Sequence, residues 1–297
     1  MRALSLEPLP FQTPVLSAPE LDVVRHDLVD VRARFALAES PIERVIEAYL
    51  KWCSPSSAPR LGLRLGAAYL AWFFAINDLA SNPEKQQLVA DIRAVLNGAQ
   101  PTLTHPLLDT TRAFQAELRE GGLEDKIGRF IDFVELMFDA FAWEIAHASQ
   151  VPVTGDYVRY RTHFVAVFPY LELWRLVLEL PDGDSTPDLV RLEQLGTELT
   201  FLVNDLLSVE RDQRERKHNL VFCLVRDHAG DEQRAEQAAR AALQERVDEF
   251  ASVRRSTLLG GEQARCYADF LGSVAEGTRL AMLELSARYP RHEAESG

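Results

Sequence analysis

The stretch LGTELTFLVNDLLSVERD, residues 195–212, joins an apolar helical run to a set of evenly spaced polar side chains. Asn204, Ser208 and Asp212 recur every four residues, so at about 100° per residue they share one stripe of a helix. The apolar residues before them indicate that this helix is largely buried. A buried stripe with an amide oxygen, a hydroxyl and a carboxylate is costly unless something binds there. Spacing alone leaves a second interpretation open, in which the stripe is an ordinary solvated helix face.

Hard oxygen ligands of this kind suit Mg²⁺, which takes one or two protein carboxylates and accepts phosphate oxygens in its remaining positions. A weaker copy of the pattern occurs earlier, in FFAINDLAS at 73–81, where Asn77 and Asp78 follow an aromatic run. Taken alone, this copy is equally well explained as a helix end before Pro83. The second copy is therefore the stronger indication of a metal site.

Helices are predicted for most of the chain, because Leu, Ala, Glu and Arg dominate, apolar residues recur at helical spacing and no strand series is found. The helical blocks are expected at 19–37, 41–53, 61–81, 83–97, 107–119, 124–149, 156–179, 187–214, 216–227, 231–257 and 262–288. Short clusters rich in Pro, Gly and Asp separate them. The pattern predicts one all-α domain over 19–297, preceded by an extended N-terminal arm over 1–18.

Composition excludes several other classes of protein. Hydrophobic residues make up 47% and charged residues 26% of the 297 residues, which is typical of a globular protein. The formal net charge of −13 disfavours nucleic acid and anionic membranes as partners. Three scattered cysteines without a CxxC motif favour a reduced cytoplasm, and neither a signal peptide nor a membrane-spanning run is found. An anionic substrate would need local compensation by metal or clustered arginines.

Two segments supply cationic and donor groups of the required kind. Arg159 and Arg161 lie in the aromatic block 156–179, and Arg288 and Tyr289 stand at the end of the last block. Arginine can grip phosphate oxygens with two parallel hydrogen bonds. Together with the oxygen stripe, these groups indicate a metal–diphosphate site at the mouth of an aromatic pocket.

At this point the sequence resembles a class I terpene synthase (terpene cyclase) of the compact bacterial type, over nearly all of the chain beyond the arm. In that family an aspartate-rich motif, DDxxD or DDxxxE, ends one helix, and an NDxxSxxxE motif lies on a facing helix. Here 204 − 77 = 127 residues separate Asn77 from Asn204, similar to the family's spacing. The resemblance implies a single-domain α-helical bundle surrounding an apolar active-site cavity.

The resemblance also implies a ligand set for Mg²⁺, with three ions expected when substrate is bound. In the second motif the ligands would be Asn204, Ser208 and Asp212, with Asp212 in place of the family's Glu, and Arg211 takes the basic position that contacts diphosphate. The first motif departs from the family, because Asp78 is its one remaining carboxylate. Weakened rather than abolished metal binding is expected there.

Further roles follow from the resemblance. Arg161 is expected to sense diphosphate, with Arg159 as the alternative, and the Arg288-Tyr289 pair is expected to hydrogen-bond it. Ala166 takes the small-residue position, which in the family precedes a helix break and whose backbone carbonyl faces the substrate. Eight residues are expected to line the substrate cavity: Phe73, Phe74, Asn77, Ala166, Phe168, Trp174, Phe201 and Tyr267.

The implied activity is a Mg²⁺-dependent cyclisation. The enzyme would ionise a linear prenyl diphosphate, farnesyl or geranylgeranyl diphosphate, and cyclise the allylic cation to a terpene hydrocarbon or alcohol with release of diphosphate. Two alternatives are an all-α prenyltransferase and a catalytically impaired relative that only binds an isoprenoid. A C10, C15, C20 or copalyl diphosphate is compatible with the sequence. We expect a cytoplasmic protein without nucleic-acid or stable membrane association, and we consider a homodimer as its assembly.

Overall fold

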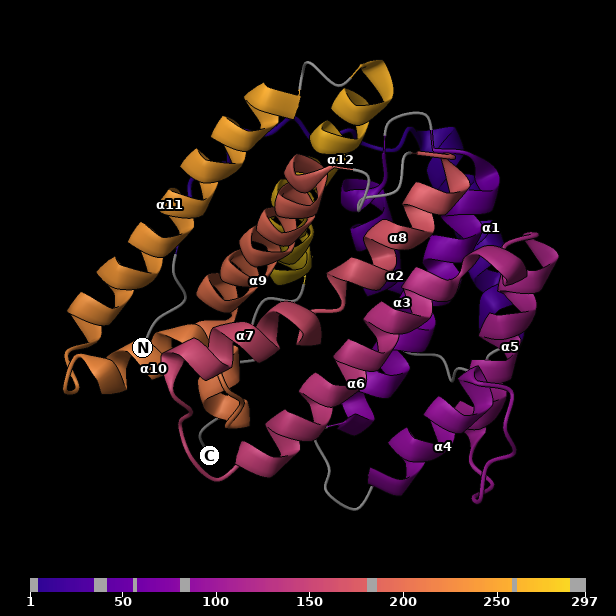
Figure 1. Cartoon of the computed structure of the whole chain (residues 1–297), viewed down its shortest axis with the longest axis horizontal. Coiled ribbons are helices and arrows are strands. Elements are labelled where there is room, and N and C mark those ends of the chain that lie inside the picture. The colour runs from indigo at the N-terminus through magenta and orange to yellow at the C-terminus, as the bar shows by residue number, and fades with distance from the viewer. Residues whose placement is uncertain are drawn as a thin grey trace.

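The computed structural model describes residues 5–34, 42–55, 58–80, 86–180, 186–257 and 261–288, without the side chains of residues 32, 34, 78–80, 257, 287 and 288. Within these ranges every regular element is helical (Figure 1), which confirms the predicted all-α class. No helix in these ranges is long and apolar enough to cross a membrane. The elements are α1 (Ala18–Arg34), α2 (Ile42–Cys53), α3 (Arg60–Ala80), α4 (Gln86–Leu96), α5 (Pro106–Glu120), the 3₁₀ turn η2 (Glu124–Lys126), α6 (Gly128–His147), α7 (Thr154–Phe164), α8 (Val167–Val177), α9 (Pro187–Glu215), α10 (Leu220–Asp227), α11 (Glu232–Thr257) and α12 (Glu262–Arg288).

Two of the predicted helical blocks are divided in the structure. The block expected at 156–179 is interrupted at Ala166, whose left-handed backbone, with φ of 59°, separates α7 from α8. Pro169 then falls in the first turn of α8, where its missing N–H removes no helical hydrogen bond. The block expected at 124–149 begins with the turn η2 before α6 starts. The prediction of one continuous helix in each block is therefore wrong.

Helix α9 is the central element of the described fold. It packs on α11 and α12 and also contacts α7, α8 and α10 (Figure 1). Its start is encoded locally, because the Thr186 hydroxyl accepts a hydrogen bond from the Leu189 amide and Pro187 occupies the first helical position. Leucine and valine side chains along most of its length are buried. A buried polar residue on this helix must therefore face a cavity or a hydrogen-bonding partner.

Glycines allow α12 to approach its neighbours closely. A Cβ atom on Gly277 of α12 would lie 2.1 Å from the Trp52 carbonyl oxygen of α2. A Cβ atom on Gly196 of α9 would lie 3.2 Å from the Leu271 carbonyl oxygen of α12. Both contacts are with backbone, which cannot move aside as a flexible side chain can. The close packing of α12 between α2 and α9 thus depends on these two glycines.

The described part of the predicted N-terminal arm, residues 5–17, forms no helix and packs against α11, α12 and α2. The Leu9 amide donates to a carboxylate oxygen of Glu276 on α12 at 3.0 Å. The Phe11 ring meets the Phe250 ring of α11 edge-on, with 5.0 Å between their centroids. These contacts hold the arm on the helical domain on the side formed by α11 and α12.

Replacing Gly277 tests the close approach of α12 and α2. We expect Gly277→Ala to lower the free energy of unfolding by about 1–3 kcal/mol, because the added methyl group forces two backbones apart. Gly128→Ala is the control, since a Cβ atom there meets nothing within 4 Å and alanine should keep or raise stability. Urea denaturation followed by circular dichroism measures both variants. Equal stability of the two would contradict this account of the packing.

Candidate functional site

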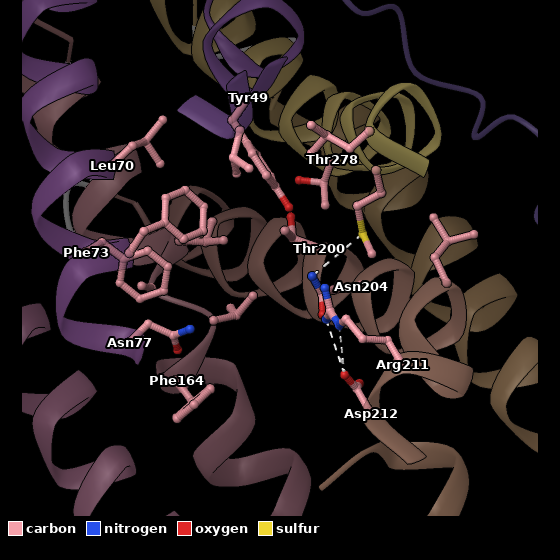
Figure 2. A pocket seen from close by; sticks show the side chains of 18 of the residues that line it. Tyr49, Leu70, Phe73, Asn77, Phe164, Thr200, Asn204, Arg211, Asp212 and Thr278 are labelled. Atoms are coloured by element: carbon pink, nitrogen blue, oxygen red, sulfur yellow. Dashed lines mark hydrogen bonds and ion pairs between the residues drawn. The ribbon is translucent and has the colours of Figure 1, made fainter. Parts of the chain in front are cut away.

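A cavity of about 1080 Å³ opens between α2, α3, α6, α7, α8, α9 and α12. Figure 2 shows its two sides, with Phe73 and Asn77 of α3 on one and Asn204 and Asp212 of α9 on the other. Its apolar lining includes Tyr49, Leu70, Phe73, Phe74 and Phe164. Its charged lining includes Glu144, Arg161, Arg211, Asp212 and Lys217. The cavity therefore combines an aromatic wall with a charged region, and its volume matches those of small-molecule sites.

The polar stripe of α9 is buried. Asn204 and Asp212 line the cavity, and the exposed fraction is 3% for both Ser208 and Asp212. The Ser208 hydroxyl donates to Oδ2 of Asp212 at 2.5 Å. The interpretation of this stripe as a solvated helix face is therefore wrong. The three predicted metal ligands share one side of α9, as their spacing predicts, but Asn204 is only half-buried and Ser208 is not among the residues that line the cavity.

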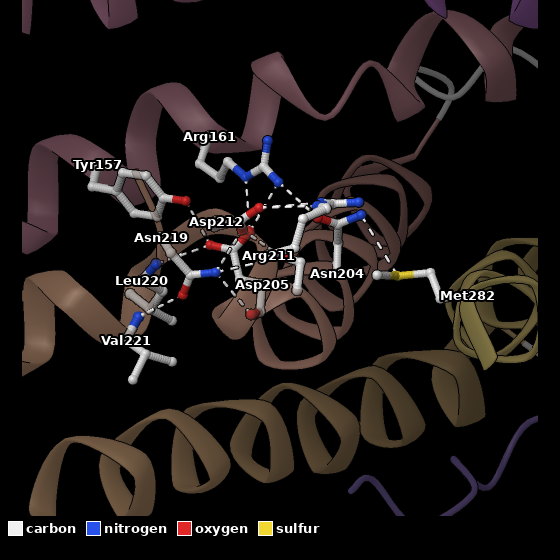
Figure 3. A network of polar contacts seen from close by, with 11 residues as sticks. Tyr157, Arg161, Asn204, Asp205, Arg211, Asp212, Asn219, Leu220, Val221 and Met282 are labelled. Atoms are coloured by element: carbon white, nitrogen blue, oxygen red, sulfur yellow. Dashed lines mark hydrogen bonds and ion pairs between the residues drawn. The ribbon is translucent and has the colours of Figure 1, made fainter. Parts of the chain in front are cut away.

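A fully buried asparagine, Asn219, holds Asp212, the last residue of the stripe, in place (Figure 3). Its Nδ2 donates to Oδ2 of Asp212 at 2.9 Å and to the Asp205 carbonyl at 2.8 Å. Its Oδ1 accepts from the Val221 amide at 3.0 Å, so the same side chain caps the N-terminus of α10. Sequence analysis missed this role. The signal was an Asn directly before the apolar run LVF, which is a common helix start.

Asp205 joins three helices at the edge of the cavity (Figure 3). Its side chain on α9 is 0% exposed and accepts hydrogen bonds from Tyr157 at 2.6 Å and from Nε of Arg161 at 3.0 Å, both on α7. It also accepts from the Leu220 amide of α10 at 3.0 Å. Burial raises the pKa of Asp205, against the lowering effect of Arg161 and the Tyr157 hydroxyl. Sequence analysis assigned no role to this residue, although it lies within the Asn-Asp pair.

The two site arginines reach the stripe from different helices. Nη2 of Arg161 donates to Oδ1 of Asn204 at 2.9 Å. Burial alone would lower the pKa of Arg161, but Asp205 and other nearby acidic groups raise it overall, so this guanidinium stays charged. Arg211 of α9 contacts Oδ1 of Asp212 through both Nε and Nη2, each at 3.2 Å. Arg159 is exposed and lies over the Tyr160 ring, so the geometry favours Arg161 as the site arginine.

Ala166 lines the cavity at the break between α7 and α8. Its carbonyl oxygen accepts a hydrogen bond from the Tyr69 hydroxyl of α3 at 2.7 Å. Tyr69 is buried and also lines the cavity, with five other aromatic rings around it. The expected carbonyl is thus present in the cavity wall, and a tyrosine hydroxyl satisfies it. The sequence carried no signal for this contact.

Four of the six aromatic side chains expected to line the cavity lie elsewhere. Phe73 and Phe74 line it, as does the polar Asn77, whereas Phe168, Trp174, Phe201 and Tyr267 do not. This corrects the predicted cavity wall. An aromatic residue on a helix of a bundle faces either the cavity or a neighbouring helix, and its type does not reveal which.

The four aromatic side chains outside the cavity lining pack against neighbouring elements. Trp174 of α8 lies over Gly62 of α3, where an added Cβ atom would meet the indole ring at 2.2 Å. Phe168 stacks on Phe133 of α6 at a centroid distance of 4.9 Å. The two remaining side chains, Phe201 of α9 and Tyr267 of α12, are buried in the helical core, where the Tyr267 hydroxyl donates to Glu193 at 2.6 Å.

Three predicted site residues lie partly or wholly outside the described residues. These are the side chains of Asp78 and Arg288 and all of Tyr289. The backbone of α3 continues through Asp78 and that of α12 through Arg288, and the nearby residues Asn77 and Ser286 line the cavity. Their predicted roles in metal and diphosphate binding stay predictions.

The donor set of α9 fits a hard divalent cation that keeps part of its own ligand shell. Among the described residues, no three His, Cys, Asp or Glu side chains are grouped to hold a metal ion. The oxygens available are the Asn204 amide, the Ser208 hydroxyl and the Asp212 carboxylate. Mg²⁺ is bound through one or two carboxylates together with water and phosphate oxygens, so this set suits it when a phosphate ligand is present. A metal that needs a complete protein ligand shell does not fit.

A carboxylate that sequence analysis missed lies in the charged region. Glu144, near the end of α6, lines the cavity together with Arg161 and Lys217. Burial, with smaller contributions from Asp212 and Asp205, raises the pKa of Glu144 to about 7 against the lowering effect of Arg161 and Lys217. No motif marks this residue in the sequence. Only the packing of α6 beside α7 places it here.

The pKa of Glu144 predicts how stability changes with pH. The folded protein holds this proton up to about pH 7, whereas an unfolded glutamate loses it near pH 4.5. Stability is therefore lost as pH rises through this window, and Glu144→Gln should gain about 1–3 kcal/mol over the wild type between pH 4.5 and 8. Urea denaturation across this range measures the difference. Glu245→Gln, at an exposed site on α11, is the control, and its stability should follow that of the wild type at every pH. A stability difference between Glu144→Gln and the wild type that does not change with pH would contradict the prediction.

Comparison with known sequences agrees with this geometry. The family model described as "Terpene synthase family 2, C-terminal metal binding" matches residues 68–249, more than half of the chain. Pentalenene synthase of Streptomyces arenae is 23% identical over 206 residues, which cover 63% of this chain and only 60% of that protein. The (+)-eremophilene synthase of Sorangium cellulosum is 21% identical over 254 residues, which cover 80% of this chain and 77% of that protein.

Solved structures show the same fold. The crystal structure of linalool/nerolidol synthase from Streptomyces clavuligerus is similar with a TM-score of 0.79 and 19% identity, over 93% of this chain and 99% of that one. A structure titled "Hedycaryol apo" is similar with a TM-score of 0.75 and 20% identity, over 97% of this chain and all of that one. Because the family model matches residues 68–249, from within α3 to within α11, the chain belongs to terpene synthase family 2.

Proposed function

We propose that this protein is a Mg²⁺-dependent class I terpene cyclase, which converts a linear prenyl diphosphate to a cyclic terpene hydrocarbon or alcohol and releases diphosphate. One observation carries the proposal. A single cavity contains both an aromatic wall and the side of α9 that carries the oxygen stripe. Arg161 donates to Oδ1 of Asn204, and Arg211 donates to Oδ1 of Asp212. An apolar chain with a diphosphate head group fits such a cavity from its wall to its mouth.

The diphosphate end of the substrate would lie beside Arg161 and Arg211. Arginine donates charge-assisted, bidentate hydrogen bonds to phosphate oxygens, and these become stronger as the leaving group gains charge. Asn204, Ser208 and Asp212 would hold Mg²⁺, which when bound adds neutralisation of the leaving diphosphate. Arg288, Tyr289 and Asp78 are proposed to complete this region from the ends of α12 and α3.

The aromatic wall would hold the isoprenoid chain. The Phe73 and Phe74 rings pack together with a centroid distance of 5.3 Å, and both line the cavity. Aromatic faces stabilise a nearby cation by about 0.5–2 kcal/mol. An apolar wall also keeps water away from the cation, which protects it from premature capture. The wall therefore favours cyclisation over simple hydrolysis.

Names of related proteins support the substrate class. A second structure of linalool/nerolidol synthase was solved in complex with 2-fluorogeranyl diphosphate. Other similar proteins are named pentalenene, eremophilene and (−)-delta-cadinene synthases. For this chain we propose farnesyl or geranylgeranyl diphosphate as the substrate. Three Mg²⁺ ions with bound substrate, a cytoplasmic location and a homodimer stay predictions.

The proposal is tested by incubating the purified protein and Mg²⁺ with geranyl, farnesyl, geranylgeranyl and copalyl diphosphates. We expect a terpene product by gas chromatography–mass spectrometry from at least one of them. Asp212→Asn should lower its rate of formation at least about 100-fold, because charge stabilisation by the metal is worth several kcal/mol. Glu245→Gln removes an exposed carboxylate of α11, outside the cavity lining, and is the control, expected to keep activity.

Two results would count against the proposal in different ways. A fully active Asp212→Asn variant would show that the metal site is elsewhere. Absence of product from all four substrates, with isoprenoid binding retained, would instead favour the isoprenoid-binding alternative.

The contact between Tyr69 and Ala166 makes a prediction about product identity. Ala166 is the N-cap of α8, so its carbonyl also accepts the first hydrogen bond of that helix. Tyr69→Phe removes the second, side-chain donor to this carbonyl. We expect the ratio of products to change while diphosphate release continues, because a carbonyl that has lost one of its two donors attracts positive charge within the cavity more strongly. The control is Tyr267→Phe, which removes an equally buried hydroxyl outside the cavity lining. An unchanged product ratio in Tyr69→Phe, measured by gas chromatography, would contradict this role.

A further inference from the structure

Both site arginines bind the oxygens that are the predicted metal ligands (Figure 3). Nη2 of Arg161 donates to Oδ1 of Asn204 at 2.9 Å, and Arg211 contacts Oδ1 of Asp212 twice at 3.2 Å. The same two guanidinium groups are the proposed donors to diphosphate. Each guanidinium group thus has two competing partners: an oxygen of a predicted metal ligand and the diphosphate group of the substrate.

The remaining contacts of Asp212 show which of its oxygens a metal ion can reach. Oδ2 accepts from the Ser208 hydroxyl at 2.5 Å and from Nδ2 of Asn219 at 2.9 Å, and both donors are buried. Oδ1 has Arg211 as its partner. A cation that approaches Asp212 from the cavity must therefore displace Arg211 or bind beside its positive charge. Either requirement weakens metal binding.

The two arginines differ in how easily they can leave. The Arg161 side chain is 14% exposed and is also paired with Asp205 at 2.9 Å, so it is held in place whatever Asn204 does. The Arg211 side chain is 49% exposed, and its hydrogen bonds among the described residues are those with Asp212. Ion pairs at such exposed positions are weak. Arg211 is therefore the arginine that can change partner at little cost.

We propose that Arg211 exchanges partners between Asp212 and diphosphate, and thereby couples metal binding to substrate binding. When Arg211 turns to a diphosphate, it uncovers Oδ1 of Asp212 for the metal ion; when no diphosphate is bound, it keeps this oxygen covered. By linkage, metal then raises the affinity for diphosphate by the same factor as diphosphate raises the affinity for metal. This inference rests on the proposed function, because it uses the same metal site and the same anion.

The helix offers a matched control. Arg214 lies one turn further along α9, is exposed, and lines the same cavity. No described contact joins Arg214 to Asp212. Arg211→Gln and Arg214→Gln remove the same charge from the same region, but only the first removes a group from the ligand oxygen. Comparing the two separates local competition from the general effect of one charge fewer.

The experiment measures binding of Mn²⁺ alone, without diphosphate, by electron paramagnetic resonance. We expect Arg211→Gln to bind Mn²⁺ about three- to tenfold more tightly than the wild type, as loss of one weak ion pair and one nearby like charge implies. Arg214→Gln should stay within about twofold of the wild type, because its charge is separated and screened by solvent. Asp212→Asn should weaken binding in both the wild-type and the Arg211→Gln background. Circular dichroism checks that every variant is folded.

A second measurement uses inorganic pyrophosphate as the anion. Its affinity is measured by calorimetry at low and at high Mn²⁺. Mn²⁺ should strengthen pyrophosphate binding in the wild type and in Arg214→Gln, and should do so less in Arg211→Gln, because the exchanging group is gone.

Each result decides a different statement. Equal or weaker Mn²⁺ binding by Arg211→Gln, together with loss of binding in Asp212→Asn, overturns the exchange and leaves the proposed metal site standing. Mn²⁺ binding that Asp212→Asn does not change, or no Mn²⁺ binding by either the wild type or Arg211→Gln, overturns the metal site and the exchange together. Tighter binding in Arg211→Gln alone supports the exchange.

Discussion

The buried carboxylate of Asp205 is the interaction on which the geometry of the site depends. It is fully enclosed, yet it carries a charge that Arg161 balances and accepts hydrogen bonds from Tyr157 and the Leu220 amide. Removing one member of such a pair leaves an uncompensated charge in a dry interior, which is far more costly than the pair itself is stabilising. This single side chain therefore ties α7 and the start of α10 to α9.

Because these three helices meet at Asp205, the cavity mouth contains charges of both signs at short range. Arg161, Arg211 and Lys217 face Asp212 and Glu144. A region of this composition can accept an anion and a cation together with little change in net charge, whereas either one alone leaves an imbalance. The proposed partner exchange of Arg211 is one consequence of that arrangement. Under the proposed function, this exchange would let the single carboxylate of the second motif bind a metal ion that arrives together with a diphosphate.

Sequence patterns predicted what depends on residues close to one another along the chain. The positions of most helices follow from apolar periodicity and from local signals such as Thr186 and Pro187. The stripe of Asn204, Ser208 and Asp212 follows from helical geometry alone. The apolar periodicity did not predict the break at Ala166, which only the resemblance implied, because a left-handed alanine has no sequence signal of its own.

Contacts between distant segments were decided by the tertiary structure. Trp174 and Phe201 have the same aromatic character as Phe73, yet the crossing of α8 and α9 with their neighbours directs them into the core. Tyr69 and Glu144 reach the site through the packing of helices that lie far apart in the sequence, whereas Asn219 reaches it through the short connection from α9 to α10. The sequence by itself determined the all-α class, the family and the oxygen stripe, because these need only local spacing and residue type. Which rings face the cavity and which oxygens the arginines cover needed the tertiary structure, because both depend on how separate helices are oriented against one another.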